Sequence, residues 1–95
     1  MDFGPLFITA GIAQAARDDV GFLSEILECL RRYQLGDWGD LCPEDIQLNE
    51  AALRTGARLM GAYTTQQGGK IWIITEAADD NGQRAATTVL LPDEY

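Results

Sequence analysis

The sequence predicts an α+β fold, in which N-terminal helices pack on a three-stranded antiparallel β-meander. Two patterns predict it. Apolar residues recur at three- and four-residue steps in the first half of the chain, whereas β-branched and aromatic residues between glycine-containing turns dominate the second half. A chain of 95 residues closes one hydrophobic core and has no surplus for another, so a single domain over residues 1–95 is expected.

A short strand and two helices are expected first. Pro5 to Thr9 is a β-prone run that either adds an N-terminal edge strand or only packs on the core, and a brief helix follows over residues 10–17. A longer amphipathic helix is predicted over about residues 19–34, ended by Gly36. Its buried stripe is expected to contain Val20, Leu23, Ile26, Leu27, Leu30 and Tyr33.

A third helix and the meander complete the domain. Pro43 opens a helix that runs to about residue 55 and stops at Gly56. A four-residue connection at 66–69 and a turn over 78–83 separate the strands. Ile71 to Ile74 are apolar on both alternations, so we expect helices on one face of this strand and a partner or a second copy on the other. The strands are expected at residues 58–65, 70–76 and 85–91.

Charge restricts the class of partner. Fifteen acidic and seven basic residues give a formal net charge of −8. This charge repels phosphate backbones, so the sequence predicts no direct binding to nucleic acid. It suits a protein partner with a basic surface, and it serves solubility equally well.

The expected location is the cytoplasm, without contact to a membrane. No apolar run approaches the roughly 20 residues of a membrane helix, and the first residues lack the basic start of a signal peptide. The two cysteines, Cys29 and Cys42, suit a reducing compartment as free thiols, although the sequence leaves a single disulfide open. They follow no metal-binding spacing, and no metal is predicted.

Catalysis is difficult to assign to this sequence. Histidine, the commonest general base near neutral pH, is absent, and the single serine, Ser24, has no base near it in the sequence. Cys42, at a predicted helix start, is the alternative nucleophile because a thiol at that position can have a lowered pKa. We therefore predict no catalytic residue and no cofactor.

The segment GDWGDLCPED, from Gly36 to Asp45, is the most unusual part of the chain. Its carboxylates either cap and start the following helix or gather around a cation. Trp38 is expected to anchor the loop to the core, with contact to a partner as the alternative. The carboxylates in question are Asp37, Asp40, Glu44 and Asp45.

Four stretches carry a resemblance: GDWG at 36–39, NE at 49–50, WIITEA at 72–77 and TTVLLPDEY at 87–95. In them the chain resembles small plasmid-related proteins of plasmids and integrative conjugative elements. The resemblance covers residues 34–95 well and the first helices loosely, and residues 78–83 lengthen the second hairpin relative to that group. It implies a mobile-element setting and brings no established activity.

Together these patterns predict a non-enzymatic, acidic protein-interaction module encoded by mobile genetic elements. One specific form is an anti-defence inhibitor, either anti-CRISPR or anti-restriction, that binds a basic surface of a host complex. The alternatives are a cation-dependent enzyme or metal-binding module at the four carboxylates, and a structural homodimer joined through the free face of the meander. The predicted partner-binding residues are Asp37, Trp38, Asp40, Glu44, Asp79 and Asp80.

Overall fold

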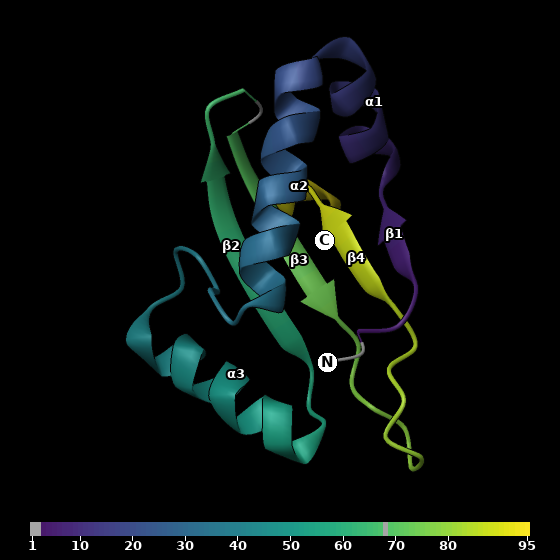
Figure 1. Cartoon of the computed structure of the whole chain (residues 1–95), viewed down its shortest axis with the longest axis vertical. Helices are drawn as coiled ribbons and strands as arrows, with labels where there is room; N and C mark the ends of the chain where they lie inside the picture. Colours follow the sequence, from purple (N-terminus) through teal and green to yellow (C-terminus); the bar gives the residue numbers. More distant parts are fainter. Residues whose placement is uncertain (1–2, 68) are drawn as a thin grey trace.

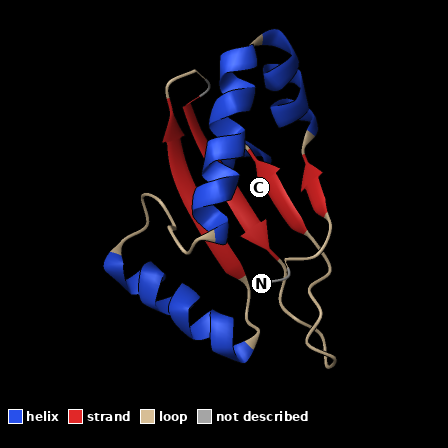
Figure 2. Cartoon of the chain, viewed as in Figure 1, coloured by secondary structure: helices blue, strands red, loops and turns tan. Residues whose placement is uncertain are grey.

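The computed structural model describes residues 3–67 and 69–95, and within these ranges it is an α+β fold of three helices and a four-stranded mixed sheet (Figures 1 and 2). Helix α2 lies over one face of the sheet, α1 lies near β1, and α3 lies beyond the β2 side of the sheet, as Figure 1 shows. No helix in the described residues is long and apolar enough to cross a membrane. The elements are β1 (Leu6–Ile8), α1 (Ala10–Asp18), α2 (Val20–Gln34), α3 (Pro43–Thr55), β2 (Leu59–Thr65), β3 (Gly69–Thr75), β4 (Thr87–Leu90) and a final 3₁₀ turn, η1 (Pro92–Glu94).

The sheet confirms the predicted meander and extends it by one strand. Strands β2, β3 and β4 pair antiparallel in sequence order, and β1 adds to the far side of β4, which gives the order β1-β4-β3-β2. The predicted edge strand is thus formed. It runs parallel to β4, a direction that the sequence did not specify, so the sheet is mixed. Strand β3 begins one residue early, at Gly69, while Gly68 of the predicted connection lies outside the described residues.

Helix α2 buries part of the predicted stripe: Ile26 and Tyr33 are in the core as predicted, and Leu30 packs against it. Its core side contains Phe22, Ile26, Cys29 and Tyr33. Val20 and Leu27, which the predicted stripe placed in the core, are 76% and 59% exposed, and Leu23 is exposed as well. Both stripes repeat at three- and four-residue steps, so periodicity does not choose between them. The aromatic side chains fill the space against the sheet.

A chain of buried hydroxyl groups crosses the core beneath α2. The Thr87 hydroxyl donates to the Phe3 carbonyl at 2.7 Å, and it shares a 2.7 Å hydrogen bond with Thr75. Because a hydroxyl has one hydrogen, Thr75 must donate to Thr87 and must accept the 2.8 Å bond from the Tyr33 hydroxyl. The hydrogen bonds therefore run in one direction, from the Tyr33 hydroxyl to Thr75, then to Thr87 and finally to the Phe3 carbonyl. Burial raises the pKa of Tyr33 to about 12.

The second face of the sheet is partly covered by the chain's own C-terminus. Tyr95 meets Trp72 edge to face, with ring centroids 5.6 Å apart, and Ile74 and Leu90 are buried. The Glu94 carboxylate fixes this segment, because it accepts hydrogen bonds from the Leu91 N–H at 2.9 Å and from the first turn of α1. Part of the cover that the sequence assigned to a partner or a second copy is thus intramolecular.

The direction of the hydroxyl chain generates a prediction. Thr75→Val leaves the buried Tyr33 O–H without an acceptor, so we expect a loss of about 2 kcal/mol in the free energy of unfolding. Tyr33→Phe removes the donor itself and leaves the bond between Thr75 and Thr87 intact, so the expected loss is about 1 kcal/mol. Urea denaturation followed by circular dichroism measures both.

Thr88→Val is the matched control, because Thr88 lies in the same strand as Thr87 but on the opposite face of the sheet. Its expected effect is within about 0.5 kcal/mol. A loss from Tyr33→Phe larger than that from Thr75→Val would contradict the inferred direction of donation.

Candidate functional site

The candidate site is built on the loop that follows α2. The Gly36 N–H donates to the Tyr33 carbonyl at 3.1 Å, and the Asp37 N–H reaches back to the Arg32 carbonyl at 2.9 Å. This pair of bonds is a Schellman motif, which needs a left-handed residue, and Gly36 has φ of 83°. The predicted end of the helix at Gly36 is confirmed.

The loop then pairs with the free edge of β2. The Ala62 N–H donates to the Trp38 carbonyl at 3.1 Å, and the Asp40 N–H donates to the Ala62 carbonyl at 2.7 Å. Gly39 lies against Ala62, and a Cβ atom at Gly39 would come within 2.0 Å of the Ala62 carbonyl oxygen. Only glycine permits this approach.

Asn49 of α3 continues the cover along the same edge. Its side-chain amide donates to the Met60 carbonyl at 2.6 Å and accepts from the Met60 N–H at 3.2 Å, so it pairs with β2 as a neighbouring strand would. Asn49 is itself buried. An uncovered strand edge presents unpaired backbone groups to other chains. The loop and Asn49 together seal this one.

Trp38 is part of the core. It is 2% exposed, its ring meets Tyr33 edge to face at 5.3 Å, and its indole N–H donates to the Glu50 carboxylate at 3.4 Å. The predicted anchoring role is confirmed. Its place among the partner-binding residues gains no support, because a buried ring offers little surface to a partner.

Asp37 and Asp40 lie on opposite sides of the sheet edge. The Asp37 carbonyl accepts from the Tyr63 hydroxyl at 2.8 Å, whereas the Asp40 carboxylate accepts from the Thr64 hydroxyl at 2.7 Å. Tyr63 and Thr64 are successive residues of β2, so their side chains point to opposite faces. Asp37 therefore lies on the helix side and Asp40 on the open side.

The Asp37 carboxylate also forms an ion pair within the chain. The Arg32 guanidinium donates to its carboxylate at 2.8 and 3.3 Å, and the Gly39 N–H donates at 3.1 Å. These bonds hold the pKa of Asp37 below its ordinary value, with Arg32 as the larger cause. Asp37 fixes the loop, and its charge is paired within the chain.

The cation alternative gains no support from this geometry. Asp37 and Asp40 are separated by the sheet edge, and no three His, Cys, Asp or Glu side chains of the described residues are grouped closely enough to hold a metal ion. Cys42 is exposed and Cys29 is buried, and both are free thiols. The Asp45 N–H lowers the pKa of Cys42, but the side chains of Asp45 and Glu44 outweigh it and the net shift is upward. The thiol is not activated.

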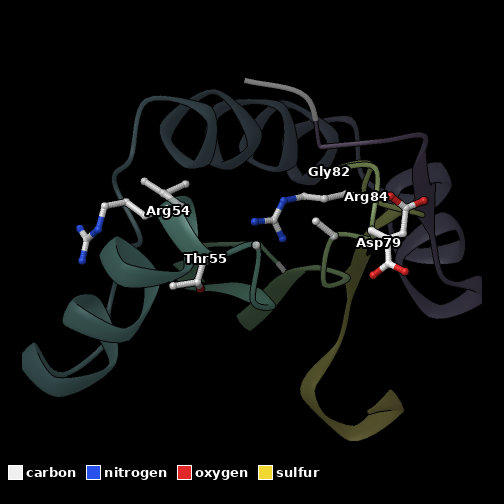
Figure 3. A pocket seen from close by; sticks show the side chains of 9 residues that line it. Arg54, Thr55, Asp79, Gly82 and Arg84 are labelled. Carbon is white, nitrogen blue, oxygen red and sulfur yellow. The ribbon is translucent and has the colours of Figure 1, made fainter.

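Asp79 and Asp80 lie at the other end of α3. They line a hollow of about 450 Å³ between the end of that helix and the turn that follows β3 (Figure 3). The Asp79 carboxylate builds this turn, because it accepts from the N–H groups of Asn81 and Gln83, each at 2.9 Å. With 13 residues, α3 is about 20 Å long, so these residues are remote from Asp40 and Glu44.

Arg84 joins that turn to α3. Figure 3 shows its side chain extending toward the helix, while Arg54 points away. The Arg84 guanidinium donates to the carbonyls of Ala57 at 2.8 Å, Glu76 at 3.0 Å and Ala52 at 3.2 Å. The hydrogen-bond donors of Arg84 are used by backbone carbonyls. Arg84 therefore holds the turn against α3 and does not form a prepared anion site.

A second hollow, of about 260 Å³, lies beside the first turns of α3 on the open side of the sheet. It is lined by Leu41, Leu48 and Met60 together with three polar residues, Asp45, Asn49 and Arg58. The sequence assigned Leu48 to the contact between this helix and the core, whereas it is 67% exposed. The position of Leu48 could have indicated an exposed apolar residue, because residues two apart in a helix, such as Ile46 and Leu48, lie on opposite sides. We define the α3 edge surface as Asp40, Leu41, Glu44, Asp45, Leu48 and Met60.

Comparison of the chain with protein-family models, with curated proteins and with solved structures gives no match. The resemblance to plasmid-related proteins therefore stays a prediction. Function has to be argued from the geometry of the α3 edge surface and from the charge of the chain.

The edge cover generates a prediction at Asn49. Asn49→Leu keeps the branched shape and the number of side-chain heavy atoms but leaves the backbone groups of Met60 without their partners. We expect a loss of about 2 kcal/mol in the free energy of unfolding. Gln47→Leu, an exposed substitution in the same helix, is the control and should change it by less than about 0.5 kcal/mol. Equal effects at the two positions would refute the role of Asn49.

Trp38 generates a second prediction. Trp38→Ala removes a buried ring from beside Tyr33 and should lower the free energy of unfolding by about 3 to 5 kcal/mol. Thermal and urea denaturation measure this loss. An unchanged melting temperature together with lost binding of a partner would restore Trp38 to the contact surface.

Proposed function

We propose that this protein is a non-enzymatic interaction module that binds a basic surface of another protein through the α3 edge surface. One observation carries the proposal. The exposed carboxylates of Asp40, Glu44 and Asp45 lie within six residues of one another in the chain, and Asp45 lines a hollow together with Leu41, Leu48, Met60 and Arg58. Residues 33–53 contain five acidic residues and no lysine or arginine, so this part of the chain is strongly negative.

The carboxylates of this surface form no close ion pair among the described residues, although Arg58 lines the same hollow as Asp45. The ion pairs of the described residues are Arg31 with Glu28 and Arg32 with Asp37, and neither involves Asp40, Glu44 or Asp45. Unpaired surface charges of one sign attract a partner of opposite charge and accelerate the encounter. This supports a basic partner.

The surface is also held rigid before binding. Asp40 is fixed through its backbone to Ala62 and through its carboxylate to Thr64, and α3 is fixed by Asn49. A preorganised surface loses little conformational entropy on binding. The hollow beside Leu48 suits an apolar side chain or the aliphatic stem of a lysine or arginine.

The specific form of the proposal is an inhibitor of a host defence complex, such as a CRISPR effector or a restriction enzyme. Proteins that bind nucleic acid carry basic grooves, and an acidic protein competes with phosphates for them. The resemblance to plasmid-related proteins supports this setting, because mobile elements encounter such complexes. The residues of the predicted set that remain candidates on this surface are Asp40 and Glu44.

Charge reversal tests the proposal. Asp40→Lys/Glu44→Lys should weaken binding to a purified CRISPR effector or restriction enzyme by about tenfold or more, which is about 1.4 kcal/mol. Binding by the unchanged chain should also weaken as salt is raised, because the attraction is between surface charges. Biolayer interferometry at low and high ionic strength measures both effects.

Asp18→Lys/Asp93→Lys is the matched control, since it changes the net charge equally at exposed positions of α1 and η1. It should retain binding. If the two double variants lose binding affinity equally, net charge alone explains the loss and the α3 edge surface has no special role. Failure of the unchanged chain to bind any defence complex at low salt would eliminate the inhibitor form of the proposal.

A further inference from the structure

The two edges of the sheet differ. The β2 edge is sealed by the loop and by Asn49, whereas β1 lies at the other end of the strand order with no strand beyond it in the described residues. Figure 1 shows β1 at the rim of the molecule. The fold thus protects one edge and leaves the other accessible.

The backbone of β1 has hydrogen-bonding groups directed outward. The Thr87 N–H donates to the Pro5 carbonyl at 2.9 Å, and the Thr9 N–H donates to the Val89 carbonyl at 3.1 Å. In a parallel ladder, alternate residues face the same neighbour. The backbone groups of Phe7 therefore also face β4, and those of Leu6 and Ile8 point away from the sheet.

The side chains of β1 are apolar and exposed. Leu6, Phe7 and Ile8 are 53%, 54% and 48% exposed. Leu6 shares a small hollow with Leu30 of α2, and the exposed Leu27 lies one turn earlier on the same side of that helix. The apolar surface thus continues from the edge strand onto α2.

Strand β1 itself carries no charged side chain, although the Glu94 carboxylate accepts hydrogen bonds from Thr9 and Gly11 just after it. Exposed strand edges in proteins are usually protected by charged residues, yet residues 3–16 contain no charged side chain. The chain as a whole carries −8, so two copies repel each other over most of their surfaces. The uncharged side chains of β1 add no repulsion of their own to such an approach.

The outward groups of β1 are complementary to themselves. If two copies meet antiparallel about a two-fold axis at Phe7, Leu6 of each lies opposite Ile8 of the other. These are hydrogen-bonded pairs, and together they form four backbone bonds. Leu6 and Ile8 then meet on the helix side, while the two Phe7 rings meet on the opposite side.

We propose that β1 is a dimerisation edge, at which a second copy of this chain pairs antiparallel through Leu6 and Ile8 and makes one continuous sheet across both copies. The inference is independent of the proposed binding at the α3 edge surface. That surface lies at the opposite end of the strand order, so dimerisation leaves it free in both copies.

Ile8→Pro tests the pairing directly. It removes the outward N–H of Ile8, while the bonds of Thr9 and Thr87 to the neighbouring backbone stay available. The unchanged chain should be a dimer by size-exclusion chromatography with light scattering, and Ile8→Pro and Ile8→Lys should be monomers. Leu35→Lys, at another exposed leucine, is the control and should stay dimeric.

Cross-linking gives a second readout that does not depend on proline. In a Cys42→Ser background, Phe7→Cys places two thiols across the two-fold axis, where Cα atoms are about 4.5 Å apart in such pairs. Mild oxidation should give a disulfide-linked dimer. Leu35→Cys in the same background should not.

Three results would overturn the inference. One is a monomeric unchanged chain at micromolar concentrations. Another is a dimer that persists in Ile8→Pro and Ile8→Lys at an unchanged melting temperature, since this would place the interface elsewhere, such as the open face of the sheet. If the proline variant fails to fold, the cross-link decides, and its absence in Phe7→Cys overturns the inference.

Discussion

The close contact between Gly39 and Ala62 is the constraint on which the rest of the structure depends. A side chain at Gly39 would collide with the β2 backbone, and the two hydrogen bonds around Ala62 form only at this distance. Once the contact is made, Trp38 is directed into the core and the chain is positioned to begin α3 beside the sheet. Asn49 can then reach Met60. The α3 edge surface follows from these contacts.

This constraint explains why the GDWGD segment is so particular. Gly36 supplies the left-handed end of α2, Gly39 permits the approach to β2, and Trp38 fills the space beside Tyr33. Asp37 and Asp40 bind on the two sides of the edge. Each residue has a structural task, and the functional potential lies in what the segment positions: the exposed carboxylates and the apolar hollow at the start of α3.

The two edges of the sheet carry two different proposed binding surfaces. The sealed β2 edge bears the acidic surface that we propose for a basic partner, and the open β1 edge bears the uncharged surface that we propose for a second copy. A dimer built at β1 would present two acidic surfaces at its opposite ends. Such an arrangement favours a partner with two basic sites, because the second contact becomes intramolecular.

The sequence by itself determined the three helices, their glycine and proline boundaries and the meander, because periodicity, caps and turns are local properties. It left open whether residues 5–9 pair, and it misplaced Val20 and Leu27 in the core. Only the tertiary structure decided these points, together with the separation of Asp37 from Asp40 and the burial of Trp38. Each depends on contacts between residues far apart in the chain, where a strand edge or a facing aromatic ring selects among patterns that are locally equivalent.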